Sequence, residues 1–95
     1  MTKAAEKDLD GLEPYRKRVV SELRALEGDP HKGHTLHGKL REYRALEFSL
    51  PGGVCRAVYK VKNDQKVCLL VVVGYHEGIY EIAALRIRRF KQKKP

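Results

Sequence analysis

The chain has 95 residues, of which 42% are hydrophobic and 34% charged, a composition that suits one domain over residues 1–95 and excludes wholesale disorder. No apolar run approaches the about 18 residues of a membrane span, and the charged N-terminus lacks the apolar core of a secretory signal, so we expect a cytoplasmic protein without membrane contact. The 20 Lys and Arg residues outnumber the 12 Asp and Glu residues, and the net charge of +8 predicts a polyanionic partner, either nucleic acid or an acidic protein.

The first 30 residues have the pattern of a helical hairpin. Thr2 is a suitable cap for a short helix, and Pro14 suits the first turn of a second helix whose apolar stripe runs over residues 14–27. Gly28 and Pro30 mark the end of this second helix, because glycine and proline terminate helices. Charged residues fill the other faces, so we expect the pair to pack against an apolar surface.

After a loop over residues 31–38, apolar and polar residues alternate, which is typical of strands. We expect strands over residues 43–50, 54–62 and 66–74 and an amphipathic helix from residue 80 onward. Turn sequences separate the strands, namely Pro51-Gly52-Gly53 and Asn63-Asp64. The order of elements predicts an α+β fold, with the N-terminal helical hairpin packed on a small antiparallel sheet of three to four strands and a C-terminal helix.

The two cysteines do not form a CxxC pair, which argues against a disulfide scaffold or a zinc knuckle and favours a reducing compartment. A turn at residues 63–64 places Cys55 opposite residue 72 or 73, and Cys68 opposite residue 59 or 60. The two thiols are then not cross-strand neighbours, and a disulfide would break the register. We therefore expect buried free thiols.

Three histidines, His31, His34 and His37, recur at spacings of three in the loop, a pattern that suits metal ligation. No carboxylate or cysteine ligand lies between them, and surface or phosphate contacts explain these residues equally well. We expect no metal site and no other cofactor.

The positive charge is concentrated in the second half of the chain. Residues 1–48 hold ten basic and nine acidic residues, whereas residues 49–95 hold ten basic and three acidic ones. Positive side chains are favourable at the C-terminus of a helix, which explains part of the positive charge of the last expected helix, where Arg86 and Arg89 lie. It does not explain the positive charge of the strands before that helix.

Arg56, His76 and Tyr80 are the candidate catalytic residues. Arg56 is either a phosphate clamp or a solvent-facing strand residue, His76 directly follows the buried strand, and Tyr80 begins the last helix. Cleavage of RNA needs a base for the 2′-hydroxyl, an acid for the leaving oxygen and cations around the phosphate. The expected register places His76 opposite residues 51–52, about 15 Å along the strands from Arg56. Additional RNA-binding cations are Lys39, Arg41, Arg44, Arg86 and Arg89.

The chain resembles the RelE/ParE toxin superfamily in an ordered series of stretches, namely residues 36–46, 53–61 and 71–76, followed by Tyr80. The resemblance also includes the helical hairpin and so covers most of the chain. This resemblance implies a RelE/ParE-like fold and a toxin of a type II toxin–antitoxin pair, neutralised by a cognate antitoxin with an acidic segment. In the RelE branch it implies metal-independent cleavage of mRNA on the ribosome, which inhibits translation. Arg56, His76, Tyr80 and Arg44 match family positions.

The chain departs from the family pattern in three places. Leu46 occupies a position that is basic in relatives, with Glu47 beside it, and the loop between His76 and Tyr80 is short. Relatives usually have a strand before the first helix, whereas here the helix is expected within a few residues of Met1, so either the sheet has lost that strand or the chain starts upstream of Met1. Loss of that strand would leave a sheet edge for the antitoxin or for a second copy in a homodimer. Two alternatives stay open: a non-enzymatic ParE-like toxin that inhibits DNA gyrase, and an inactive RNA-binding relative.

Overall fold

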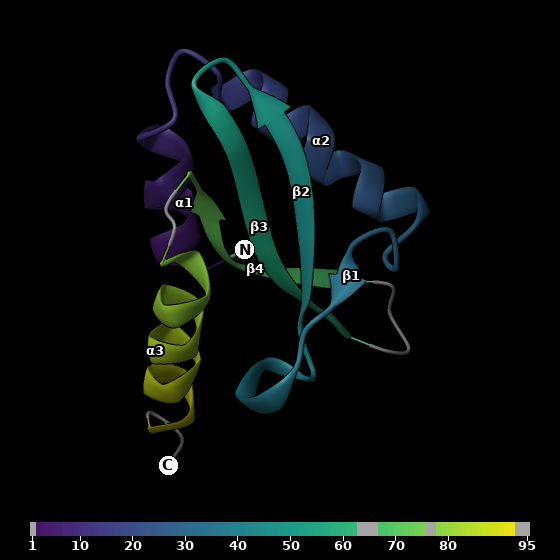
Figure 1. Cartoon of the computed structure of the whole chain (residues 1–95), viewed down its shortest axis with the longest axis vertical. Coiled ribbons are helices and arrows are strands. Elements are labelled where there is room, and N and C mark those ends of the chain that lie inside the picture. Colours follow the sequence, from purple (N-terminus) through teal and green to yellow (C-terminus); the bar gives the residue numbers. More distant parts are fainter. Residues whose placement is uncertain (1, 63–66, 76–77, 93–95) are drawn as a thin grey trace.

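Three α-helices and a four-stranded antiparallel sheet make up the computed structural model, which describes residues 2–62, 67–75 and 78–92 (Figure 1). In chain order the elements are α1 (Lys3–Asp10), α2 (Arg16–Gly28), β1 (His34–Thr35), the short 3₁₀ helix η1 (Gly38–Leu40), β2 (Arg44–Leu50), β3 (Gly53–Lys62), β4 (Val67–Gly74) and α3 (Ile79–Gln92). The strands lie in the order β1-β2-β3-β4. The expected α+β class, the helical hairpin and the C-terminal helix are confirmed.

The helical hairpin begins with the expected cap. The side-chain oxygen of Thr2 accepts a hydrogen bond of 3.1 Å from the backbone N–H of Ala5, which satisfies one of the free donors at the start of α1. The expectation that Pro14 lies in the first turn of α2 is wrong, because a turn closed by the bond from Tyr15 N–H to Leu12 O occupies this stretch and α2 begins at Arg16. The helix ends at Gly28, as expected.

The hairpin between β2 and β3 follows the sequence pattern closely. Leu50 pairs with Gly53, and the two connecting residues form a tight turn. Gly52 and Gly53 have φ angles of 103° and 145°, which glycine adopts without the steric cost that a side chain would impose. The two-residue strand β1 and helix η1 were not expected, because such short elements carry no periodic pattern.

The register between β3 and β4 differs from the expected one. Lys62 pairs with Val67, so four residues separate the paired ends rather than two; the expected turn residues 63–64 lie outside the described residues. An irregularity at residues 58–59 shifts the pairing by a further residue, and Arg56 lies opposite Gly74. The expected register is therefore wrong, and the separation expected between Arg56 and His76 involves a residue that lies outside the described ones. Cys68 pairs with Val61, so the two cysteines are indeed not cross-strand neighbours.

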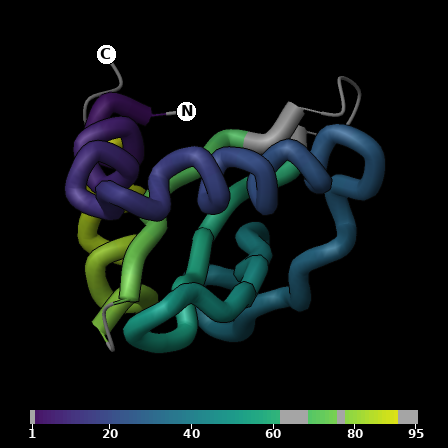
Figure 2. The backbone as a smooth tube through the Cα atoms, turned by 90° about the horizontal axis from the view of Figure 1, so that it is seen from above, coloured from purple at the N-terminus to yellow at the C-terminus, as the bar shows by residue number. Residues whose placement is uncertain are grey.

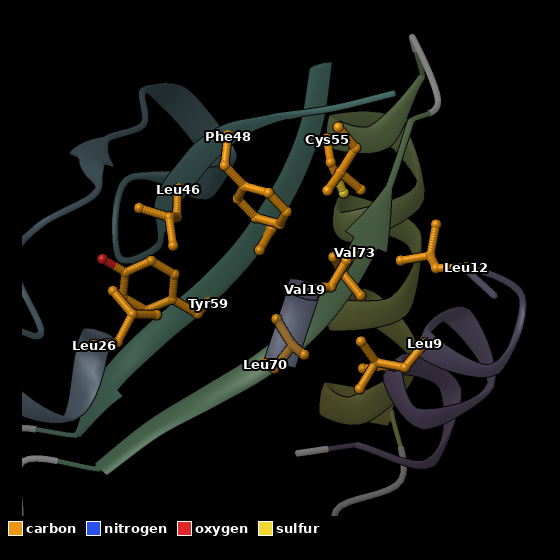
Figure 3. Packing of buried hydrophobic residues seen from close by; sticks show 13 residues of the cluster. Leu9, Leu12, Val19, Leu26, Leu46, Phe48, Cys55, Tyr59, Leu70 and Val73 are labelled. Carbon is orange, nitrogen blue, oxygen red and sulfur yellow. The ribbon is translucent and has the colours of Figure 1, made fainter. Parts of the chain in front are cut away.

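Each face of the sheet has its own apolar core. Helices α1 and α2 form a layer over one face, where Figure 2 shows them above the strands. Leu9, Val19, Phe48 and Tyr59 are among the residues buried there (Figure 3). Cys55 also lies in this core; burial raises the pKa of its thiol to about 11 despite opposing backbone hydrogen bonds, which keeps the thiol neutral.

Helix α3 covers part of the other face. It packs on β4 and β3 and encloses a second apolar cluster. This cluster contains Leu40, Tyr43, Val58, Val71, Val72, Ile79, Ala83 and Ile87. No helix among the described residues is both long enough and apolar enough to cross a membrane.

Along the outer edge of β4, backbone groups bond to side chains of α1 and α3 and to the backbone of Thr2. Arg86 of α3 donates to both carboxylate oxygens of Asp8 in α1, at 2.7 and 3.1 Å, and to the carbonyl of Val71 at 2.9 Å. Asp8 in turn accepts from the N–H of Val73 at 3.2 Å, and the N–H of Thr2 donates to Leu70. These contacts occupy backbone groups of Leu70, Val71 and Val73 with which a neighbouring strand would otherwise pair.

We expect Asp8→Ala to lower the free energy of unfolding by about 2–3 kcal/mol, since it leaves a largely buried guanidinium and the Val73 N–H without their acceptor. Asp10→Ala is the matched control, because Asp10 is exposed and its ion pair with Arg16 contributes at most about 0.5 kcal/mol. Urea denaturation followed by circular dichroism measures both. Equal losses in the two variants would contradict a structural role for the Asp8–Arg86 pair.

Candidate functional site

The face of the sheet on the α3 side is only partly covered. Alternate residues of a strand point to opposite faces, so Arg56 and Lys60 of β3 lie on the same face as Val58, which packs under α3. On β2, Glu47 and Ser49 of this face are exposed. We call this exposed region, formed by Glu47, Ser49, Arg56 and Lys60, the open face.

Arg56 and Glu47 form an ion pair at the centre of the open face. The two residues lie directly opposite each other on neighbouring strands, and the Nε atom of Arg56 lies 2.6 Å from Oε2 of Glu47. The side chains are 30% and 43% exposed, so both are accessible to a ligand. The hydrogen bond to Glu47 raises the pKa of the Arg56 guanidinium and keeps it fully protonated.

Tyr80 approaches the same pair from the first turn of α3. Its phenol also raises the pKa of Arg56, through charge interaction and side-chain hydrogen bonding, although its contribution is smaller than that of Glu47. The ring is partly buried and packs against the second apolar cluster. The structure thus brings together two of the three candidate catalytic residues, while His76 lies outside the described residues.

Sequence reasoning did not assign Glu47 or Lys60 to the site. Glu47 looked like a loss of positive charge, because its pairing with Arg56 depends on the register of two strands. Lys60 lies on the face of Arg56, and its ammonium lies 5.8 Å from the centre of the Tyr43 ring, within the range of a cation–π contact. The alternation of basic residues along β3 was the signal that could have identified Lys60.

The five cations assigned to RNA binding lie in four different places. Lys39 of η1 and Arg41 just after it are exposed and line a groove against α3, whereas Arg89 is exposed elsewhere on α3. Arg86 is engaged by Asp8 and Val71 at the β4 edge. Arg44 lies on the opposite face of the sheet from Arg56.

Arg44 holds a loop in place. Its guanidinium donates to the carbonyl oxygens of Gly33 and His31, at 3.0 and 3.1 Å. The hydroxyl of Tyr59 accepts from the N–H of Gly33 at 3.0 Å. A side chain at residue 33 has no room, because a Cβ atom there would lie 2.6 Å from the carbonyl oxygen of Ala45. The contacts of Arg44 are therefore those of a structural residue.

Among the described residues, the histidines of the loop over residues 31–38 do not belong to a metal site. Within residues 2–62, 67–75 and 78–92, no three His, Cys, Asp or Glu residues are grouped so that they could hold a metal ion. His34 and His37 are both exposed. The described residues thus offer a polar and cationic face rather than a metal centre.

Comparison with known proteins gives neither a family nor a neighbour. No protein-family model matches the sequence, and no curated protein or solved structure shows a significant match. The resemblance to RelE/ParE toxins therefore stays a prediction. Any inference about function depends on the arrangement of Arg56, Glu47 and Tyr80.

We expect Arg44→Gln to lower the free energy of unfolding by about 1–2 kcal/mol, because two carbonyl groups lose a charged donor. Arg24→Gln, at an exposed position of α2, removes the same charge and should change stability by less than about 0.5 kcal/mol. Urea denaturation compares them. An Arg44→Gln protein as stable as the parent would show that this guanidinium is free for a ligand.

Proposed function

We propose that the protein is an RNA-cleaving toxin of the type II toxin–antitoxin class, acting on mRNA at the ribosome. The observation that carries the proposal is the meeting of Arg56, Glu47 and Tyr80 on the open face. A cation paired with a carboxylate, and a phenol that acts on the same cation, are groups that metal-independent cleavage of RNA can use.

In the proposed reaction Glu47 is the base. Its carboxylate takes the proton of a 2′-hydroxyl, and the resulting oxygen attacks the adjacent phosphorus. The bond to the 5′-oxygen breaks, and this oxygen takes a proton from Tyr80, leaving a 2′,3′-cyclic phosphate and a 5′-hydroxyl. Arg56 balances the charge that develops on the phosphate oxygens. The sequence assigns His76 to the same reaction as a general acid or base.

The ion pair gives Glu47 and Arg56 a defined starting geometry. Each side chain fixes the other, which reduces the rotamer freedom that a substrate would otherwise have to restrict. A phosphate of the RNA can bind to the N–H groups of Arg56 that Glu47 does not use. The carboxylate of Glu47 then lies beside the 2′-hydroxyl next to that phosphate. Lys60 adds a second positive charge on the same face for the neighbouring phosphate.

The openness of this face supports a requirement for the ribosome. Glu47 and Ser49 are exposed, and the face offers RNA contacts from one side only. A nucleotide that is held from one side only is poorly oriented for in-line attack. A second macromolecule that holds the RNA against this face would therefore raise the rate of cleavage. In this proposal that macromolecule is the ribosome, which holds the mRNA in its decoding site.

Purified protein added to an in vitro translation reaction tests the proposal. We expect mRNA cleavage only with ribosomes present, and a loss of rate of at least about a hundredfold for Glu47→Gln, Arg56→Ala or Tyr80→Phe. His76→Ala tests the assignment made from sequence.

Glu27→Gln and Arg24→Ala are the matched controls, since both residues are exposed on α2, away from the open face. Cleavage should be unchanged in these two variants. Full cleavage by folded Glu47→Gln and Arg56→Ala proteins would refute the proposed chemistry. Inhibition of DNA supercoiling with translation unaffected would identify the ParE-like alternative instead.

A further inference from the structure

The open face carries an exposed apolar side chain at its end next to the turn between β2 and β3. Val54 of β3 is 44% exposed, whereas Val58 on the same face of the strand is fully buried under α3. Val54 lies opposite Ser49 of β2, which is also exposed. In Figure 1 the turn between the two strands lies at the top, beyond the start of α3. We call the surface formed by Ser49 and Val54 the shelf.

The shelf lies beside the ion pair of Glu47 and Arg56. Ser49 follows Glu47 by two residues on β2, and Val54 precedes Arg56 by two residues on β3. Side chains two residues apart on a strand point to the same face, so the shelf and the ion pair share one surface. They are separated by about 7 Å along the strands, at about 3.3 Å per residue. This separation lets a single nucleotide contact both of them.

The proposed function, on which this inference rests, gives the RNA a direction across the sheet. Glu47 lies on the β2 side of Arg56, whereas Tyr80 acts on Arg56 from α3, which packs on β4 and β3. When the cleaved phosphate is bound by Arg56, the ribose that gives its 2′-hydroxyl proton to Glu47 lies over β2. The 5′-oxygen that leaves is then directed toward α3. The nucleotide 5′ to the cleaved bond is therefore the one that lies next to the shelf.

The base of this nucleotide has one accessible direction along the strands. In a nucleotide the base is attached to the carbon next to the one that bears the 2′-hydroxyl, so the base also lies close to Glu47. On one side of Glu47 the next pair of this face is Ala45 and Val58, and both are fully buried. On the other side the next pair is Ser49 and Val54, and both are exposed. Of these two pairs, only the shelf is free to contact the base.

We propose that Ser49 and Val54 bind the base 5′ to the cleaved bond and determine which bases are accepted there. Val54 offers aliphatic surface to the flat face of a base, and the hydroxyl of Ser49 can donate or accept a hydrogen bond at the edge of the base. The contact of Arg56 with a phosphate is the same for every base, so selectivity has to come from base contacts such as these. Because the base must be unpaired to reach the shelf, the substrate class is single-stranded RNA.

The positions at which mRNA is cut test this assignment. Ser49→Ala removes the hydroxyl, and Val54→Ala removes two methyl groups from an exposed side chain. Each purified variant is added to an in vitro translation reaction, and the ends of the fragments are mapped by primer extension. We expect the relative use of the four bases 5′ to the cut to change at least about threefold in each variant. The relative use of bases 3′ to the cut should not change.

Ser21→Ala and Leu85→Ala are the matched controls. Ser21 is exposed on α2, and Leu85 of α3 is 50% exposed, close to the value for Val54. Both residues lie outside the open face, so both controls should cut at the same positions as the parent protein. Circular dichroism confirms that each variant is folded.

The outcomes separate this inference from the proposed function. If the parent cuts mRNA and both shelf variants keep its base preference 5′ to the cut, the role of the shelf is refuted and the proposed function stands. A change of preference at the base 3′ to the cut would show that the RNA runs in the opposite direction, and would also overturn the inference. A parent protein that cuts no mRNA in the presence of ribosomes would refute the proposed function, and this inference with it.

Discussion

The contact between Asp8 and Arg86 determines how the rest of the molecule is arranged. The carboxylate comes from α1 and the guanidinium from α3, and both also bond to the backbone of β4. The first and last helices are thereby tied to one strand from opposite faces of the sheet. Because breaking a largely buried ion pair leaves the other charge without a partner, this pair stabilises the packing of both helices on β4.

This tie also positions the candidate site. Tyr80 and Arg86 belong to the same helix, so fixing Arg86 at the edge of β4 fixes the direction in which the first turn of α3 points. Arg56 lies opposite Gly74 at the end of β4, close to where that helix begins. The meeting of Tyr80 with the Arg56–Glu47 pair therefore follows from the contacts of α3 with β4 rather than from any local motif.

The positive charge of the chain has two distinct uses. Arg44 and Arg86 donate to carbonyl groups and to a buried carboxylate inside the fold, where they stabilise a loop and a sheet edge. Lys60 and Arg56 lie on the open face, and the cations beside η1 line the groove. The net charge of +8 therefore overstates the number of cations that are available to a polyanion.

The sequence allowed the helices, the three long strands and the turn at Gly52 to be predicted, because each rests on local periodicity or on a local conformational requirement. It did not reveal the Asp8–Arg86 pair, since no pattern links residues that far apart. The position of Glu47 opposite Arg56 was likewise hidden.

The register of β3 and β4 was mispredicted for a physical reason. A two-residue turn and a four-residue connection give similar alternation, and the irregularity at residues 58–59 leaves no mark in the sequence. Candidate residues on the strands could therefore be chosen by type and by face, but their distances from one another could not be predicted.

A titration with single-stranded RNA, followed residue by residue with backbone amide NMR, tests the central claim most directly. The account predicts chemical-shift changes that centre on Glu47, Arg56, Lys60 and the first turn of α3, and that weaken as salt is added because phosphate contacts dominate. Changes centred on α1 and α2, or the absence of any change at low salt, would contradict an RNA site on the open face.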